Sequence, residues 1–520
     1  MKYRVGIDVG GTNTDAIIID ENNMVVSKYK TFTTKDIFSG INDALKEVIK
    51  QSVIDVKNIT HAMLGTTQCT NAIVERKKLE KVVSIRLAGP ATRAVHPYAN
   101  WPSDIKELIN QEYYIAEGGF EYDGTPIKNI DKEEIENIVK VNIGNCHNYA
   151  ISCVFAPISG SQEEEVRNII KNIDPNANVS ISSEIGSLSL LERENATILN
   201  AALVNVIKNV VSGFKEALKK EKINGASIYL CQNDGTLMDV EYALKFPVLT
   251  IASGPTNSIR GGIYLSKEDT GIILDVGVTT SDIGVVVNGF PRETSIESSV
   301  GGVTTNFRMP DIVSISIGGG TIVREDELGN ITIGPDSVGY SLSQEALIFG
   351  GKTITLSDIA IKLGMAKFGD ETKLKDLDEL FAQKVMGKVK SMIEDSIDLV
   401  STSRVNENLI VVGGGSSIVP KEYSNITNVL VPDNFEVANA IGASIAKVSG
   451  NFEGIISFAK TPREEAIANS KEIAITNAIK AGAAPNSVEI IEVEEFPIAY
   501  HPEDAVRIKI KAVGELEHKY

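Results

Sequence analysis

Hydrophobic residues near the N-terminus of the chain occur in short runs that are separated by polar turns. Residues 3–9 are apolar apart from Arg4 and Asp8, residues 10–14 form a turn of glycine, threonine and asparagine, and residues 16–19 are apolar again. A second polar turn leads into a third run at residues 24–29. Runs of this length between tight turns predict three strands that form two antiparallel hairpins.

Strand-like runs and helical periods alternate through the next 150 residues. Apolar positions three and four residues apart predict helices, and short apolar runs predict strands. Helices are expected at residues 37–53, 68–77, 132–141 and 162–173, and strands at 61–64, 82–87 and 150–156. Residues 88–130, which contain four prolines, are expected to be irregular apart from a hairpin turn at 121–124. The alternation favours an α/β fold.

The opening pattern recurs after a long helix that is expected to begin around residue 186 and to end near residue 218. Residues 7–15 read IDVGGTNTD, and residues 274–282 read LDVGVTTSD. Both copies contain an apolar residue, Asp-Val-Gly, and then Thr-x-Thr/Ser-Asp. An internal repeat this specific indicates two copies of one supersecondary unit and therefore two related lobes.

Three segments are expected along the chain. The first lobe would comprise residues 1–185, the second lobe residues 186–450, and a small C-terminal α/β cap residues 451–520. The remaining predicted elements are helices at 377–401 and 463–480 and strands at 409–412, 488–493 and 505–512.

Composition limits the classes to which the protein can belong. The chain has 520 residues, of which 42% are hydrophobic and 23% charged, the profile of a globular protein of about three domains. Its formal net charge of −18, without clusters of Lys and Arg, argues against binding to nucleic acid or to an anionic membrane surface. Because no run of about 18 apolar residues occurs, no membrane span is expected.

The four cysteines are scattered, and no Cys/His cluster has the spacing of a zinc site. Few thiols in a long chain, and no apolar segment of signal-peptide type, predict a cytoplasmic protein. Cys69 is expected to be a small buried hydrophobe rather than a nucleophile. His61, His96 and His147 are expected to be hydrogen-bonded structural residues.

The two repeated turns carry the candidate chemistry. Backbone N–H groups of a Gly- and Thr-rich hairpin turn, together with the Thr hydroxyls, form a concave array of donors that suits phosphate oxygens. Asp8 and Asp275 end the strands before the turns. Their carboxylates would repel a phosphate group unless a divalent cation lay between carboxylate and phosphate, so a Mg²⁺ ion held by Asp8 and Asp275 through water is implied. One such turn alone is more often an ordinary hairpin with a capping aspartate, but two matching copies favour a phosphate clamp. The residues expected to bind phosphate are Gly10, Gly11, Thr12, Asn13 and Thr14 in the first turn and Gly277, Thr279 and Thr280 in the second.

Two further glycine clusters are expected to contact the ligand. Three glycines after a strand let the backbone approach a flat ligand closely. The residues expected to contact adenosine are Gly413, Gly414, Gly415 and Ser416, and the backbone of Gly318 and Gly319 is also expected to touch the ligand.

Other polar positions near these motifs have simpler interpretations. Asp15 and Asp282, which end the two repeats, are expected to fix turns rather than to take part in chemistry. Residues 439–443, from Asn439 to Ala443, are expected to begin the following helix and to close the adenine pocket. Thr355 and Asp358 are typical of a helix N-cap.

The order of a phosphate hairpin, a second phosphate hairpin and an adenosine loop resembles that of the actin-like ATPase superfamily. Within this superfamily the chain is similar to the hydantoinase/oxoprolinase family, whose members open cyclic amides with ATP. The sequence departs from the family's usual pattern at Val278, where a second glycine is usual, and at residues 91–97, where an arginine-rich segment is usual. The segments that carry the resemblance are residues 65–67, 70–76, 182–184, 192–193, 199–201, 233–238, 253–255, 275–282, 317–321 and 334–335.

The resemblance implies an α/β fold of two actin-like (ribonuclease H-like) ATPase lobes, with ATP and Mg²⁺ as cofactors and Asp8 and Asp275 as catalytic residues. It implies ATP-dependent hydrolysis of a cyclic amide (hydantoin, 5-oxoproline or lactam) through phosphorylation of the amide oxygen. It also implies an oligomeric enzyme with a second, large hydantoinase B-like subunit as partner. Three alternatives remain open: an actin-like small-molecule kinase, an ATP-dependent carboxylase subunit, and a nucleotide-driven switch that acts on a partner protein.

Overall fold

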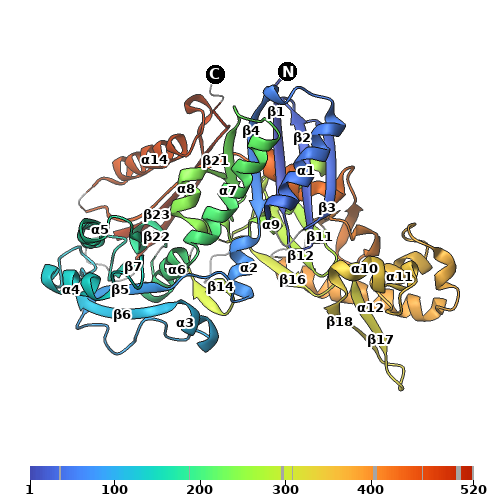
Figure 1. Cartoon of the computed structure of the whole chain (residues 1–520), viewed down its shortest axis with the longest axis horizontal. Coiled ribbons are helices and arrows are strands. Elements are labelled where there is room, and N and C mark those ends of the chain that lie inside the picture. The colour runs from blue at the N-terminus through green and yellow to red at the C-terminus, as the bar shows by residue number, and fades with distance from the viewer. Residues whose placement is uncertain are drawn as a thin grey trace.

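The computed structural model describes residues 1–33, 37–186, 188–293, 298–306, 309–401, 407–459, 461–498 and 505–517. They form an α/β structure with several sheets, so the expected fold class is confirmed (Figure 1). The finer expectation of two actin-like lobes stays a prediction.

The largest sheet has nine strands in the order β22-β23-β21-β10-β9-β4-β1-β2-β3. Strands β1, β2 and β3 form the two antiparallel hairpins expected at the N-terminus, and β4 pairs with β1 in parallel. The strands are β1 (Tyr3–Val9), β2 (Asn13–Asp20), β3 (Val25–Phe32), β4 (Ile59–Thr66), β9 (Ser227–Cys231), β10 (Leu237–Asp239), β21 (Val448–Ser457), β22 (Glu489–Pro497) and β23 (Ala505–Gly514).

Helices cover both faces of the β1–β2 hairpin. Side chains of a strand point alternately to its two faces. On β2, Ala16 and Ile18 pack with helices α1 (Ile37–Ser52) and α7 (Val204–Lys220), whereas Ile17 and Ile19 pack against helix α13 (Ala438–Ile445). Asp15 therefore lies on the α13 face, together with Asp8, its partner across the hairpin.

Helix α9 (Ser253–Ser266) lies across α13 with the two backbones in contact. A side-chain carbon at Gly261 or at Gly442 would overlap the main chain of the other helix. This close crossing brings two helices that are far apart in the sequence to the same end of β1.

A second sheet contains the second copy of the repeat, in the order β13-β12-β11-β19-β20, with β16 paired to β12. In each copy the first strand pairs antiparallel with the next strand and parallel with a later one, β4 or β19. The registers also match, because Asp8 lies opposite Asp15 and Asp275 lies opposite Asp282. The strands are β11 (Gly271–Val276), β12 (Ser281–Val287), β13 (Phe290–Pro291), β16 (Ile312–Ile315), β19 (Glu407–Val412) and β20 (Ile426–Leu430).

A third sheet of four parallel strands, β6-β5-β7-β8, forms a separate layer with helices α4 and α5 (Figure 1). Two strand pairs, β14–β15 and β17–β18, complete the strands, and the β17–β18 pair projects from the body of the protein in Figure 1. These strands are β5 (Val82–Gly89), β6 (Asn110–Glu117), β7 (Asn148–Cys153), β8 (Asn178–Ile181), β14 (Ser298–Val300), β15 (Val303–Thr305), β17 (Thr321–Glu325) and β18 (Ile331–Ser337). The other helices are α2 (Gln68–Val74), α3 (Ser103–Ile109), α4 (Lys132–Asn142), α5 (Ser161–Ile173), α6 (Leu190–Ala202), α8 (Val240–Lys245), α10 (Leu342–Glu345), α11 (Leu356–Lys362), α12 (Glu379–Val400) and α14 (Arg463–Lys480).

Several elements differ from the sequence prediction. The single long helix expected from around residue 186 to 218 begins at Leu190 and is two helices, α6 and α7, which are separated at Leu203 and bent by 47°. The stretch expected to be irregular contains helix α3 and strand β6. The C-terminal strands continue the nine-stranded sheet rather than forming a sheet of their own, and helix α14 packs on β21 and β23. The segment boundaries at 185 and 450 stay predictions.

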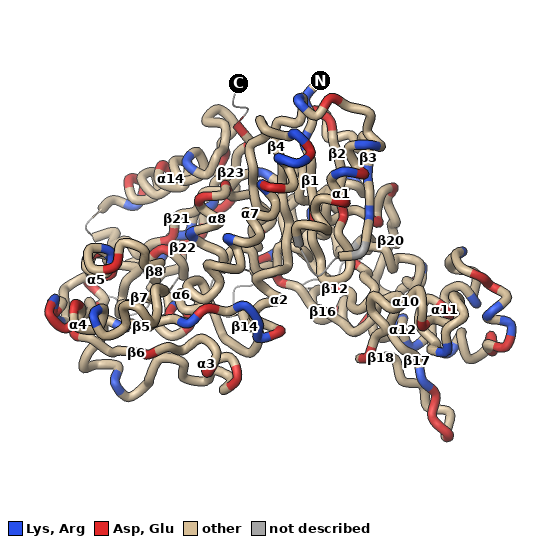
Figure 2. Tube along the Cα trace, in the orientation of Figure 1, with Lys and Arg blue, Asp and Glu red and all other residues tan. Residues whose placement is uncertain are grey.

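Charged residues of both signs are distributed over the outer elements, while long uncharged stretches run through the central sheets (Figure 2). None of the described helices is by itself long and apolar enough to cross a membrane. Only α6 and α7 taken together, across their bend, reach the required length and composition.

Candidate functional site

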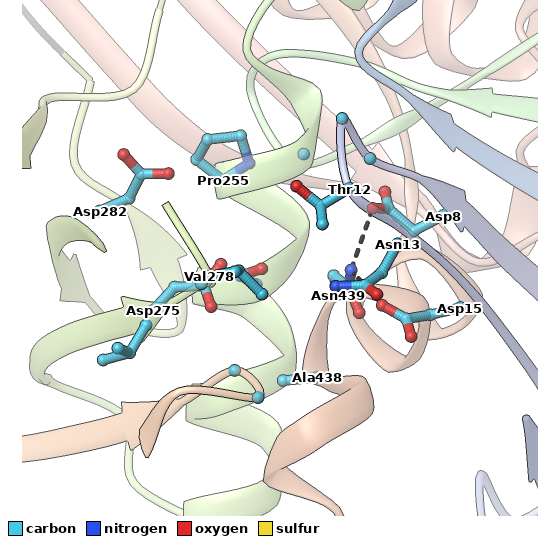
Figure 3. Close-up of a pocket in the computed structure, with 18 of the residues that line it drawn as sticks. Asp8, Thr12, Asn13, Asp15, Pro255, Asp275, Val278, Asp282, Ala438 and Asn439 are labelled. Carbon is cyan, nitrogen blue, oxygen red and sulfur yellow. Dashed lines mark hydrogen bonds between the residues drawn. The ribbon is translucent and has the colours of Figure 1, made fainter. Parts of the chain in front are cut away.

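The two repeated hairpins, β1–β2 and β11–β12, meet over one cavity of about 470 Å³ (Figure 3). The first turn of α9 and the start of α13 flank this cavity, as Pro255 and Asn439 show in Figure 3. The candidate residues that line it are Asp8, Gly10, Gly11, Thr12, Asn13, Asp275, Gly277, Thr279, Thr280, Gly413 and Gly414. The structure thus brings together residues that are spread over more than 400 positions of the sequence.

The two hairpin turns at the cavity are built alike. The N–H of Gly10 donates to the carbonyl oxygen of Asn13 at 2.9 Å, and the N–H of Gly277 donates to the carbonyl oxygen of Thr280 at 2.9 Å. The tip of each turn faces the cavity with its glycine and threonine residues. Val278, which stands where a second glycine was expected, lines the cavity beside them.

Four residues form a row across strands β4, β1, β2 and β3. Gly65 lies opposite Asp8, Asp8 opposite Asp15, and Asp15 opposite Lys30. Cross-strand neighbours share one face of the sheet, so the three side chains of this row point to the α13 side. The Lys30 Nζ lies 2.8 Å and 2.9 Å from the two carboxylate oxygens of Asp15.

Two asparagines hold the carboxylate of Asp8. Asn257 of α9 donates from Nδ2 to Oδ1 at 3.1 Å, and Asn439 of α13 donates from Nδ2 to Oδ2 at 3.0 Å. Asn439 also donates to Oδ2 of Asp15 at 2.9 Å. A β-carbon at Gly65 would overlap both Asp8 and Asn257, so this position requires glycine.

Burial changes the acidity of the carboxylates at the cavity. It raises the pKa of Asp8 to about 7, against the opposing hydrogen bonds from Asn257 and Asn439. It also raises the pKa of Asp282 to about 6. Burial also raises the pKa of Asp15, and the ammonium of Lys30 is the strongest opposing effect. Burial raises the pKa of Asp275 as well, and there a hydrogen bond with Ser258 is the strongest opposing effect. Carboxylates gathered at low dielectric gain stability from a bound cation.

The glycine loop that follows β19 packs directly against the second hairpin. Gly413 has a φ of +87°, and a β-carbon there would overlap the Asp275 carboxylate. The N–H of Gly415 donates to the carbonyl oxygen of Val276 at 2.8 Å. The loop therefore fixes the strand that carries Asp275 while Gly413 and Gly414 face the cavity.

Five candidate residues lie behind the cavity wall rather than at its surface. The side chain of Thr14 pairs with Thr33 at 3.2 Å, and the hydroxyl of Ser416 donates to the carbonyl of Gly413 at 2.6 Å. The N–H of Gly319 supports the second turn by donating to Gly277 at 3.0 Å. The full set outside the lining is Thr14, Gly318, Gly319, Gly415 and Ser416. Their geometry supports the turns from behind, and direct ligand contact by them stays a prediction.

The interpretation of Asp15 and Asp282 as turn-fixing residues is wrong. Asp15 bonds to Lys30 and Asn439, and Asp282 accepts a hydrogen bond from the Ser314 hydroxyl. Both side chains line the cavity.

Several residues that complete the site belong to none of the glycine motifs in the sequence. Lys30 and Glu436 line the cavity, and Asn257 holds Asp8 from behind. Ser258, one position further along α9, opposes the rise in the pKa of Asp275 by hydrogen bonding. The signal in the sequence that points to Asn257 and Ser258 is their place just after the Ser-Gly-Pro segment that begins α9.

The remaining candidates have structural roles. Cys69 is fully buried, and burial raises the pKa of its thiol to about 12. His61 bonds to Thr60 at 2.9 Å, and His147 bonds to Asp174 at 2.6 Å. His96 is exposed with its ring near that of Tyr113, and the hydrogen bond expected for it stays a prediction. Thr355 and Asp358 form a capping box at the start of α11, as expected.

The carboxylates of the cavity provide part of a ligand shell for a divalent cation. Among the described residues, no group of three or more His, Cys, Asp or Glu side chains is arranged to chelate a metal ion. Asp8 and Asp275 provide hard oxygen ligands, and water or phosphate oxygens would complete the shell that Mg²⁺ prefers. The arrangement suits a polyphosphate that is bound together with its cation.

Comparison with protein families gives two matches that follow one another along the chain. Residues 4–174 match the hydantoinase/oxoprolinase N-terminal region, and residues 193–370 match hydantoinase/oxoprolinase.

Two relatives illustrate the similarity in sequence. An uncharacterised protein of Methanocaldococcus jannaschii is 28% identical over 86% of this chain and 73% of that protein. Caprolactamase subunit alpha of Pseudomonas jessenii is 23% identical over 85% of this chain and 66% of the relative. The chain thus spans just under two thirds of the caprolactamase subunit.

Two solved structures share the fold. The ATP-dependent caprolactamase from Pseudomonas jessenii has a TM-score of 0.78 at 18% identity, and the match covers 99% of this chain and 88% of that one. Nucleotide-free acetone carboxylase has a TM-score of 0.69 at 16% identity, with the same two coverages. At these identities the likeness concerns the fold alone.

Proposed function

Because the chain belongs to the hydantoinase/oxoprolinase family, we propose that it binds ATP with Mg²⁺ between its two repeated hairpins and uses it to hydrolyse a cyclic amide. The observation that carries this proposal is the meeting of two matching Asp-Val-Gly turns over one cavity that contains buried carboxylates. The related caprolactamase is ATP-dependent, which supports the same nucleotide for this chain.

The residues of the chain divide the binding task between them. The turn at Gly10–Asn13 and the turn at Gly277–Thr280 would hold the β- and γ-phosphates from opposite sides through backbone N–H groups and hydroxyls. Asp8 and Asp275 would hold the cation through water. The loop at Gly413 and Gly414 would lie against the adenosine.

The catalytic task of these residues is positioning and charge stabilisation. Phosphorylation of the amide oxygen makes the amide carbon more electrophilic, so that water can attack it. The protein must hold the reacting groups in line. Asn257 and Asn439 keep the Asp8 carboxylate in a single orientation, so the cation would be held at a defined place. Asp275, fixed by the loop at Gly413, would orient the attacking nucleophile from the other side.

Relatives also support a partner for the chain. The caprolactamase relative is named as a subunit, and the acetophenone and acetone carboxylase relatives are named as subunits too. We therefore propose that a second, large subunit completes the enzyme and contributes to the recognition of the amide.

A subunit of an ATP-dependent carboxylase is the second candidate function. The fold shared with acetone carboxylase over 99% of the chain supports it. Both functions would use the same nucleotide site, so they differ in the acceptor of the phosphoryl group and not in the residues described above.

One experiment tests both candidates. The purified chain, with and without a hydantoinase B-like subunit, is incubated with ATP and Mg²⁺, and phosphate release is measured in the presence of caprolactam, hydantoin or 5-oxoproline, or of a ketone with bicarbonate. Stimulation by one cyclic amide, with appearance of the ring-opened product, is expected. Stimulation only by ketone and bicarbonate would select the carboxylase, and failure of the chain to bind ATP with Mg²⁺ would exclude both.

A further inference from the structure

Lys30 is a positively charged side chain at a cavity that is otherwise acidic. Among the described residues that line the cavity, it is the one basic side chain, against five carboxylates. The carboxylates are Asp8, Asp15, Asp275, Asp282 and Glu436. A polyphosphate entering this cavity therefore meets a single ammonium that the chain itself supplies.

The position of Lys30 is set from three sides. Its backbone lies on β3 opposite Asp15, and its Nζ donates to Oδ2 of Asp15 at 2.9 Å and to the carbonyl oxygen of Glu436 at 3.0 Å. Its Cε passes close to Gly414 of the glycine loop. The ammonium thus lies where the first hairpin, the segment before α13 and the loop proposed for adenosine come together.

The hydrogen bonding of Lys30 leaves capacity for a ligand. An ammonium has three N–H donors. Within the described part of the chain, two of them bond to Asp15 and to Glu436, while the second Asp15 oxygen is near at 2.8 Å but receives no well-aligned hydrogen bond. The side chain of Lys30 is 31% exposed, whereas that of Asp15 is 1% exposed.

Asp15 can release part of its contact with Lys30 without becoming unpaired. Asn439 donates to the same carboxylate at 2.9 Å, so this hydrogen bond persists if the ammonium turns toward the cavity. The buried carboxylate therefore acts as an anchor that keeps the ammonium at the cavity before a ligand arrives.

We propose that Lys30 binds a phosphate oxygen of the nucleotide, with Asp15 as the counterion that holds the ammonium ready at the cavity wall. This inference rests on the proposed function, because it adds a residue to the same nucleotide site. A charge-assisted hydrogen bond from a lysine suits a phosphate oxygen and has no counterpart in the adenosine part of the ligand.

Lys28 provides a matched control on the same strand and the same face. Its Nζ bonds to Oδ1 of Asn434 at 2.8 Å and to the carboxylate of Glu436 at 2.5 Å, so it ties β3 to the same segment before α13. It does not line the cavity. Substitution of Lys28 therefore reports the loss of that tie without the loss of a cavity charge.

The test compares the affinities of ATP, ADP and adenosine for the wild-type chain and for the variants Lys30→Met, Lys30→Arg and Lys28→Met, by calorimetry with Mg²⁺ present. Lys30→Met is expected to weaken ATP and ADP by about tenfold or more, because a charged hydrogen bond is lost, and to change adenosine by less than twofold. Lys30→Arg is expected to restore most of the affinity for ATP. Lys28→Met is expected to change ATP and adenosine by the same factor.

Equal effects of Lys30→Met on ATP and adenosine, or no effect on either, would overturn the proposal. If Lys30→Met does not fold, as judged by circular dichroism, Lys30→Gln replaces it, and the ratio of ATP to adenosine affinity decides in the same way. If the wild-type chain binds neither ATP nor ADP, the proposed function itself is contradicted. If the wild-type chain binds ATP and the Lys30 variants bind it with the same affinity, only the role of Lys30 is contradicted.

Discussion

Asn439, the second residue of helix α13, donates a hydrogen bond of 3.0 Å to the Asp8 carboxylate on the first strand, 431 positions away in the sequence. The same amide donates to Asp15 at 2.9 Å. One side chain therefore orients two buried carboxylates on adjacent strands, and it does so from an element that is distant in the chain.

Asn439→Ala is expected to lower both stability and nucleotide turnover. It removes one donor from each of two buried carboxylates, because Asn257 still donates to Asp8 and Lys30 still donates to Asp15. A hydrogen bond to a charged group contributes about 1.5–3 kcal/mol. We expect the free energy of unfolding to fall by about 2 kcal/mol or more, and kcat/KM for ATP to fall by about tenfold or more. Denaturant titration and phosphate release measure the two effects. As a control, Asn477→Ala removes a partly exposed asparagine that donates to a backbone carbonyl far from the cavity, and it should leave turnover unchanged and lower stability by less.

Asp8→Ala is expected to abolish ATP turnover while the chain stays folded. Burial disfavours the charged form of this carboxylate, which offsets part of the loss of its hydrogen bonds from Asn257 and Asn439. We expect a loss of turnover of about a hundredfold or more, with a circular dichroism spectrum like that of the wild type. Glu21→Gln, at an exposed turn residue of the same sheet, serves as the control. Turnover that is unchanged in Asp8→Ala would remove Asp8 from the site.

Gly65→Ala tests whether the space beside Asp8 is needed. The added methyl group would overlap the Asp8 carboxylate and the Asn257 amide, so these groups must move apart or the strand must shift. Overpacking of this kind costs about 1–3 kcal/mol, and we expect loss of ATP turnover in addition. The matched substitution Gly387→Ala, in α12 with open space around it, should raise stability by about 0.5–1 kcal/mol. If the two variants behave alike in thermal melts and turnover assays, the close packing of Gly65 against Asp8 and Asn257 is not needed.

Asp234 predicts a dependence of stability on pH. Burial alone would raise the pKa of Asp234, but the ammonium of Lys511, 3.0 Å away, and the hydrogen bonds from Thr236 hold it below its ordinary value of 3.8. A carboxyl whose pKa is lowered by folding stabilises the native state above pH 3.8, and this stabilisation is lost as the pH falls through the folded-state pKa.

Asp234→Asn is therefore expected to destabilise the chain by about 1.5–3 kcal/mol at pH 7, because Lys511 loses one of its two carboxylate partners and keeps Glu293 at 2.8 Å. The difference from the wild type should shrink as the pH is lowered below 3.8. Chemical denaturation at several pH values measures it, with the exposed Asp395→Asn as reference. A difference that does not vary with pH would show that the ion pair does not account for the effect.

Much of the fold could be predicted because its signals are local. The strands at both repeats follow from apolar runs between glycine turns, and helix α14 begins and ends where its period predicted. The repeated motif also led to most of the cavity lining, since the same residues at the same spacing produced the same register in both hairpins.

Lys30 shows why other parts of the site could not be predicted. Strands β2 and β3 carry an irregularity after Ile18, where the pairing shifts by one residue. If pairing continued unshifted from the β2–β3 turn, where Ile19 lies opposite Val25, Asp15 would lie opposite Tyr29. The shift places Asp15 opposite Lys30 instead. A one-residue shift exchanges the two faces of a strand, so the sequence pattern alone assigns the lysine to the wrong side.

The break between α6 and α7 has a similar cause. No glycine or proline lies near Leu203, and the apolar period continues across it. The bend depends on packing, because nearly the whole of α6 is buried on all sides. Local propensity carries no information about such surroundings.

The distance along the chain between Asp8 and Asn439 has a consequence for how the protein is made. On the ribosome, the first hairpin emerges hundreds of residues before α13, and the nine-stranded sheet lacks one side until β21–β23 follow. A nascent chain that contains both hairpins but not yet residue 439 lacks the helix that holds Asp8 and Asp15, so its nucleotide cavity is incomplete. The nucleotide therefore cannot act as a template for early folding. Binding would instead mark a nearly finished polypeptide, and partly synthesised chains would depend on chaperones rather than on their own ligand for protection.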